Sequence, residues 1–183
     1  MIYLLSAIII GIISDYCLNK YYKPVYYPIT AILSMIACAV LTQAFDERIV
    51  IIKGLIFCQS LILIAYCDIK THEIPNVLLI PIIACGFINF KPMQSLIGFF
   101  SVSILFFVVS AVTKGKGIGG GDVRLIAATG FVLGAESVIA GTLIGLILFL
   151  IFYLIVHNKL KQEMYAMAPW LSIGCFLAYI STF

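Results

Sequence analysis

The chain has 183 residues, of which 63% are hydrophobic and only 10% are charged. Soluble domains carry roughly 25% charged residues, so the polar surface is too small to coat a soluble globule. The net charge is a modest +3, and no basic cluster with interleaved aromatic residues occurs. The composition therefore excludes a soluble enzyme and predicts that nucleic acid is not a partner.

Apolar runs recur along the whole length, which predicts an all-α, polytopic membrane helix bundle in the lipid bilayer, with residues 1–183 forming one integral membrane domain. The first run lacks a positively charged start and a small-residue cleavage site, so we expect a retained helix. The expected bundle has about eight membrane segments, one of them short. These segments are 2–18, 26–44, 50–66, 74–90, 95–113, 123–135, 137–156 and 168–182.

The stretch 123–156 decides the number of passes. As one helix it would be about 51 Å long, which exceeds a single membrane crossing. Gly130 and Gly134 weaken its middle, so we predict two helices that meet near residues 134–136. The first of them, 123–135, would span only about 20 Å and would have to be sheltered by neighbouring helices or reach a wet cavity.

The Lys and Arg residues support the same topology. With eight passes, eight of the 11 basic residues fall on one side of the membrane, whereas a single crossing by 123–156 leaves six on that side. The positive-inside rule then puts the eight in the cytosol. They are Lys20, Lys23, Lys70, Lys114, Lys116, Arg124, Lys159 and Lys161, and the other side holds Arg48, Lys53 and Lys91.

Two aspartates stand at the ends of apolar segments. Asp68 closes the third segment and Asp122 opens the sixth. Two complete passes separate them, so both carboxyl groups lie at the same membrane surface. Like charges a few ångströms apart cannot both ionise cheaply, and one carboxyl then holds a proton while the other draws one from water. The pattern indicates an aspartic peptidase dyad.

Three glycines, Gly119, Gly120 and Gly121, precede the second aspartate. We expect them to take unusual backbone angles and to let the chain approach an extended substrate strand. Taken alone, a G-x-G-D run is weak, and the residues leave other roles open. Asp122 could be a helix N-cap, a role that Asp often fills, and Asp68 a solvated helix end. Interfacial acids also suit a small transporter, although such proteins favour polar groups near mid-membrane.

Two motifs resemble those of the type IV prepilin peptidases. Residues 68–76 read Asp-Ile-Lys-Thr-His-Glu-Ile-Pro-Asn, and residues 117–125 read Gly-Ile-Gly-Gly-Gly-Asp-Val-Arg-Leu. The resemblance covers about residues 60–180 and implies that Asp68 and Asp122 are the catalytic pair, with no metal and no cofactor. It also implies a prepilin or pseudopilin precursor as substrate, cut at the cytosolic face of the cell membrane just before its apolar helix. The site-shaping residues would be Ile74, Pro75, Asn76, Lys70, Lys116, Arg124 and the three glycines.

Some features depart from the family pattern. Bifunctional members carry a cysteine-bearing domain after the first helix and also N-methylate the product, but residues 18–25 leave no room for it. Ala168-Pro169-Trp170 is a loose version of the last motif. The alternative enzyme class, the presenilin and signal-peptide-peptidase group, pairs Tyr directly with Asp, whereas Cys67 intervenes here. We expect Asp15, near the end of the first segment, to be a solvated helix end.

Overall fold

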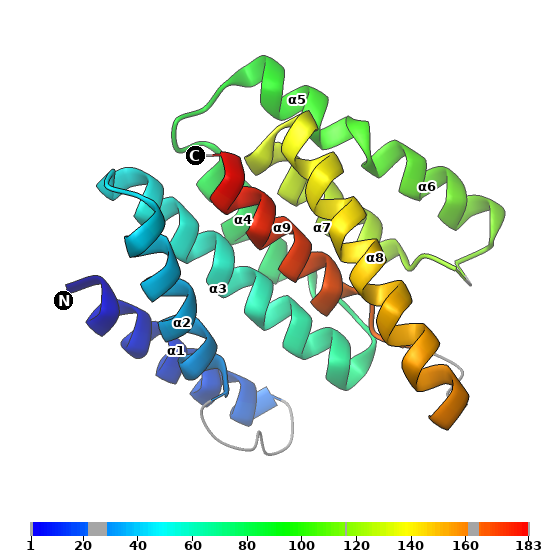
Figure 1. Cartoon of the computed structure of the whole chain (residues 1–183), viewed down its shortest axis with the longest axis horizontal. Helices are drawn as coiled ribbons and strands as arrows, with labels where there is room; N and C mark the ends of the chain where they lie inside the picture. Colours follow the sequence, from blue (N-terminus) through cyan, green and yellow to red (C-terminus); the bar gives the residue numbers. More distant parts are fainter. Residues whose placement is uncertain (1, 22–28, 116, 161–164, 183) are drawn as a thin grey trace.

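The computed structural model describes residues 2–21, 29–115, 117–160 and 165–182, and within these ranges the regular structure is entirely helical. The helices pack as an antiparallel bundle (Figure 1). This confirms the predicted all-α fold. The elements are α1 (Ile2–Tyr21), α2 (Ile29–Ala44), α3 (Arg48–Thr71), the short 3₁₀ helix η1 (Asn76–Leu78), α4 (Leu79–Gly86), α5 (Pro92–Ser101), α6 (Ser103–Val112), α7 (Gly120–Leu133), α8 (Ala135–Leu160) and α9 (Ala168–Thr182).

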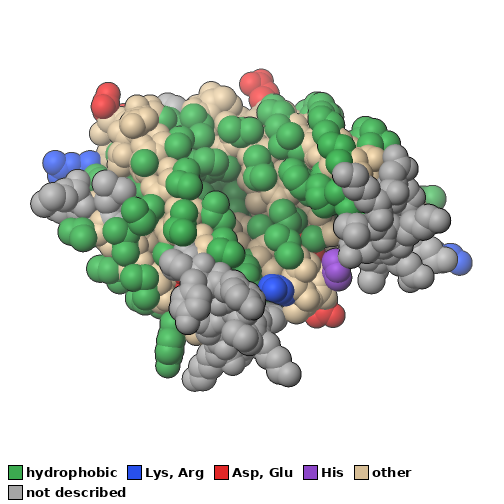
Figure 2. All heavy atoms as spheres, turned by 60° about the horizontal axis from the view of Figure 1, so that its bottom comes forward, with side chains coloured by type: hydrophobic (Ala, Val, Ile, Leu, Met, Phe, Trp, Pro, Cys, Tyr) green, Lys and Arg blue, Asp and Glu red, His purple; other side chains and the backbone are tan. Residues whose placement is uncertain are grey.

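The outside of the bundle is apolar. Among the described residues, three helical stretches are long and apolar enough to cross a membrane, namely Arg48–Thr71, Pro92–Val112 and Ala135–Val156. Large hydrophobic side chains on α8 stand open to the surroundings, with Leu143, Ile147 and Leu154 each more than half exposed. Figure 2 shows hydrophobic side chains across the visible face, with charged groups mainly at its edges. Such a surface fits a lipid environment.

The predicted break in the stretch 123–156 is confirmed. Helix α7 ends at Leu133, and Gly134 adopts a positive φ of 82° before α8 begins at Ala135. Only glycine takes this backbone conformation at low cost. Most of α7 is buried, because α4, α5, α6, α8 and α9 all pack against it. The short helix is therefore sheltered by its neighbours, as its length required.

The fourth predicted segment is shorter than expected. Of residues 74–90, only η1 and the eight-residue α4 are helical, and α4 is about 12 Å long. The apolar run is real, but the helix ends at Gly86 and residues 87–89 form a turn in which Asn89 has a positive φ of 54°. Composition alone could not locate that turn, because Phe87, Ile88 and Phe90 are as apolar as the helix before them.

Backbones of α5 and α7 lie in direct contact. A Cβ atom built on Gly98 would lie 2.1 Å from the carbonyl oxygen of Gly130, and one on Gly130 would lie 2.2 Å from that of Gly98. Neither position has room for any side chain. Small residues at helix crossings are typical of membrane bundles, where close backbone packing replaces the hydrophobic effect as the force between helices.

Candidate active site

A cavity of about 430 Å³ lies where α3 ends and α7 begins. Both aspartates that the sequence singled out line it, which confirms that they lie at one end of the bundle. Seven of the nine predicted site-shaping residues line the same cavity. They are Ile74, Pro75, Asn76, Gly119, Gly120, Gly121 and Arg124.

Asp68 is the deeply buried member of the pair, with 7% of its surface exposed. It lies in the last turn of α3, and its Oδ2 accepts a hydrogen bond of 2.9 Å from the backbone N–H of Ala168. Ala168 is the first residue of α9. Burial disfavours the charged form of this carboxyl group, and the backbone donor and the positive end of the helix dipole oppose that cost.

Asp122 lies in the first turn of α7, at the end of the bundle, as the third residue of the helix. Its Oδ1 is buried and accepts no hydrogen bond from the described residues. Burial raises the pKa of the Asp122 carboxyl to about 7; the charge of Asp68 adds to the rise, and a hydrogen bond from the Gly119 backbone opposes it. Near neutral pH the Asp122 carboxyl is therefore partly protonated, and the protonated fraction grows as the pH falls below 7.

The N-cap of α7 is Gly119, and the alternative role of Asp122 as the N-cap is wrong. The backbone N–H groups of Asp122 and Val123 both donate to the Gly119 carbonyl, at 3.1 and 3.3 Å. The helix starts three residues earlier than the apolar run, because a glycine at each of its first two positions adds no apolar signal. Asp122 is thus a residue inside the first turn that turns its side chain toward the cavity.

The expectation of unusual backbone angles at the three glycines is also wrong. Gly119 has φ −70° and ψ 149°, and Gly120 and Gly121 are helical. What matters is how much room each glycine leaves for the groups around it. A Cβ on Gly121 would lie 3.1 Å from Cβ of Ile74, one on Gly119 would lie 3.2 Å from Oδ2 of Asp122, and one on Gly120 would meet nothing within 4 Å.

Arg124 ties the two motifs together. Its Nε donates to the carbonyl of Gly120 at 3.0 Å, and its Nη1 donates to Oδ1 of Asn76. Asn76 opens η1, immediately after Pro75. The Ile-Pro-Asn stretch that follows Asp68 is therefore joined to the helix that carries Asp122, which gives both motifs a structural reason to occur together.

Two predicted site-shaping residues have other positions. Lys70 is exposed and does not line the cavity; its Nζ lies 6.0 Å from the ring centroid of Tyr66. Lys116 lies outside the described residues. Asp15 is bonded rather than merely solvated, because its Oδ1 accepts a hydrogen bond of 2.6 Å from Thr30 on α2.

Sequence reasoning missed three contributors to this site, two that line the cavity and one that bonds to Asp68. His72 and Glu73 line the cavity, and they stand inside the first motif, so their position was visible but their role was not. The backbone N–H of Ala168 is the third, and a main-chain donor 100 residues from Asp68 leaves no mark in side-chain identity. Among the described residues, no three His, Cys, Asp or Glu side chains gather as a metal site would require.

Comparison with known proteins places these observations in a family. The sequence profile of the type IV leader peptidase family matches residues 55–155, which contain both aspartates. A prepilin leader peptidase/N-methyltransferase from Bacillus subtilis is 27% identical over 164 residues, covering 84% of this chain and 65% of the relative. One from Neisseria gonorrhoeae is 27% identical over 167 residues, covering 84% and 57%.

The chain thus spans about three fifths of the length of the curated relatives that it matches. No solved structure matches it. The family profile covers more than half of the chain and favours the prepilin group over the presenilin group and over a transporter. The chain belongs to the type IV leader peptidase family.

Proposed function

We propose that the protein is a membrane aspartic endopeptidase that removes the leader peptide from type IV prepilin-like or pseudopilin precursors. One observation carries the proposal: Asp68 and Asp122 share a cavity in which their environments differ. Two carboxyl groups whose surroundings separate their proton affinities are the expected acid and base of such a reaction. The family membership and the names of the relatives support the same activity.

The two carboxyl groups take different roles. Asp68, stabilised as a carboxylate by Ala168, draws a proton from a water molecule that attacks the carbonyl carbon of the scissile peptide. Protonated Asp122 donates a hydrogen bond to the carbonyl oxygen and stabilises the charge that develops there. When the tetrahedral intermediate collapses, the C–N bond breaks and the leaving amine takes up the proton that Asp68 had accepted.

An apolar groove beside the dyad suits the substrate's membrane helix. The groove has a volume of about 350 Å³ and lies between α2, α3 and α9. Its lining includes Tyr66 and Ile69 on either side of Asp68, and Pro169 next to Ala168. We expect the apolar helix that follows the cleavage point to lie along this groove, with the extended leader reaching the cavity.

We further propose that the protein lies in the cell membrane with its active site facing the cytosol. Exposed Lys70 and Lys114 lie near this end of the bundle, and the positive-inside rule favours a cytosolic position for such residues. Single cysteines at positions 69 and 121, in a background without the native cysteines, should react with an impermeant reagent only from the cytosolic side. Labelling from opposite sides would contradict a shared site.

Cleavage of a purified prepilin in liposomes tests the activity. The wild type should release the leader, and Asp68→Asn and Asp122→Asn should not, although both variants remain folded in the membrane. Normal cleavage by either variant would refute the assignment. Chelators should leave the rate unchanged, and inhibition that added zinc reverses would point to another catalytic class. We expect no N-methylation of the product.

A further inference from the structure

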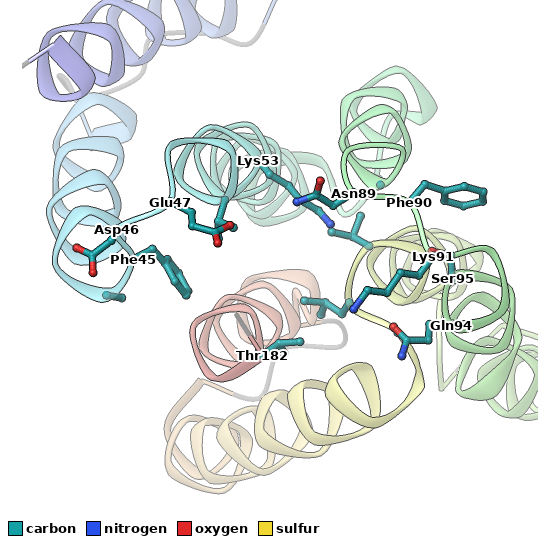
Figure 3. Close-up of a pocket in the computed structure, with 16 residues that line it drawn as sticks. Phe45, Asp46, Glu47, Lys53, Asn89, Phe90, Lys91, Gln94, Ser95 and Thr182 are labelled. Carbon is teal, nitrogen blue, oxygen red and sulfur yellow. The ribbon is translucent and has the colours of Figure 1, made fainter.

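A second cavity, of about 860 Å³, lies at the other end of α3 and α7, away from the dyad. It is enclosed by the turn between α2 and α3, the turn between α4 and α5, the α7–α8 junction and the end of α9 (Figure 3). Neither the motifs nor the proposed reaction uses any residue of this cavity. Its polar groups therefore need an explanation of their own.

Lys53 is the most unusual of them. It lies in the second turn of α3 and only 3% of its surface is exposed, although it lines the cavity. Keeping an ammonium group away from water is costly unless other groups compensate its charge. Ionisable residues within membrane helices are rare and mark functional sites more often than structural ones.

A second cation faces the same space. Lys91 immediately precedes α5, and Figure 3 shows its side chain extending from the α4–α5 turn into the cavity. Lys53 and Lys91 thus line the same cavity. Two like charges beside one cavity repel each other, and an anion between them would turn that repulsion into attraction on both sides.

The other groups that line the cavity favour a phosphate ester as the bound anion. Two side-chain amides, Asn89 and Gln94, also line the cavity and can donate hydrogen bonds to phosphate oxygens (Figure 3). The wall also includes apolar side chains, among them Val132 and Leu133, which suit the carbon skeleton of an amphiphile. The ends of apolar helices also lie at the depth where lipid headgroups are found.

The acidic residues occupy a different part of the cavity. Figure 3 shows Asp46 and Glu47 at the α2–α3 turn, across the cavity from Lys91. Both are exposed, so water screens their charges more than that of Lys53. They would suit a cationic substituent on the same ligand.

We propose that this cavity binds a phosphate ester between Lys53 and Lys91, as carried by the headgroup of a membrane phospholipid. The site is independent of peptidase activity, so its test measures binding alone. The thermal unfolding midpoint of the purified chain in detergent should rise with added dioleoylphosphatidylglycerol. It should not rise with dioleoylglycerol, which has the same acyl chains but lacks phosphate. Inorganic phosphate, compared with chloride at equal ionic strength, tests a soluble source of the same group.

Three variants complete the test. Lys91→Gln and Lys53→Met should each weaken phospholipid binding at least about tenfold, the loss typical of one charge-assisted contact. Arg48→Gln is the matched control, because Arg48 is an exposed basic residue near the same end that does not line the cavity. It should bind as the wild type does. Lys91 is exposed and outside the helices, so its variant decides the matter if Lys53→Met does not fold.

Each outcome has a meaning. A midpoint that rises with phospholipid in the wild type and Arg48→Gln, but not in Lys91→Gln, supports the proposal with a lipid ligand. A rise with inorganic phosphate that depends on Lys91 supports it with a soluble ligand. Equal responses of Lys91→Gln and Arg48→Gln, equal responses to the two lipids, or no response to any phosphate compound would overturn it.

Discussion

Asp68 and Asp122 are the same residue type in one cavity, yet the bundle surrounds them differently. Asp68 ends a long helix and accepts a hydrogen bond from the first residue of α9. Asp122 begins a short helix, and its buried Oδ1 accepts no hydrogen bond from the described residues. The hydrogen bond from Ala168 favours the carboxylate form of Asp68 relative to that of Asp122, whose surroundings favour the carboxylic acid. The difference assigns base and acid without any difference in side-chain chemistry.

The largest effect on cleavage should follow from removing either titratable carboxyl group. Asp68→Asn and Asp122→Asn should each lower the cleavage rate by at least about 10³-fold, because each preserves shape but abolishes proton exchange. The double variant should be hardly slower than either single one, since the two groups act as a unit. Single-turnover rates on a purified precursor measure this. Additive losses would mean that the two aspartates act independently.

The pH dependence tests which carboxyl holds the proton. The pKa of Asp122 is raised to about 7, so Asp122 is protonated below that pH and loses its proton as the pH rises through it. The value of kcat/KM should therefore fall by about tenfold for each pH unit well above 7. Because the two groups interact, the measured value belongs to the pair. A rate that stays level up to pH 9 would contradict an acid role for Asp122.

Two neighbouring glycines, Gly120 and Gly121, differ in the room that they leave for a side chain. Gly121→Ala would press against Ile74, whereas Gly120→Ala would meet nothing. We expect Gly121→Ala to lower kcat about tenfold, because it displaces the first turn of α7 from the Ile-Pro-Asn stretch, and a shift of about 1 Å can cost 10²-fold. Gly120→Ala should stay within about twofold of the wild type. Equal effects of the two changes would contradict the proposal that Gly121 is needed to leave room for Ile74.

Asp15 should show the smallest effect on catalysis. Its Oδ1 accepts the hydroxyl hydrogen of Thr30 and so joins α1 to α2. Asp15→Asn keeps an acceptor there but loses the charge, and it should cost about 1 kcal/mol of stability or less with cleavage nearly unchanged. Thermal unfolding and cleavage assays on the same preparation separate the two. A loss of cleavage at unchanged stability would make Asp15 part of the site.

The sequence predicted what side-chain identity and spacing can record. The two aspartates, the Ile74-Pro75-Asn76 stretch and Arg124 all line the cavity. They could be predicted because each belongs to a contiguous sequence motif. The break at Gly134 was predictable too, since a helix through 123–156 would have exceeded the membrane thickness.

The missed features depend on tertiary contacts. Ala168 acts through its backbone N–H, and any residue but proline would supply that donor. The glycine angles were wrong because glycine permits unusual conformations without requiring them. Lys53 stood out in the sequence only as one of three basic residues on the far side. Lys53 is buried beside a cavity that it shares with the turn between α4 and α5, and the apolar run 74–90 concealed that turn.

The backbone contact between Gly98 and Gly130 fixes α7 against sliding. With no side chain between the two helices, a displacement of α7 along its axis would drive carbonyl groups into each other. Asp122 is thus carried by a helix that is held by this backbone contact, whereas Asp68 is positioned jointly by α3 and α9, which pack together. The proposed catalytic pair thus has one member held by a contact between two backbones and one held by a hydrogen bond between two helices, and the proposed substrate groove lies beside the second.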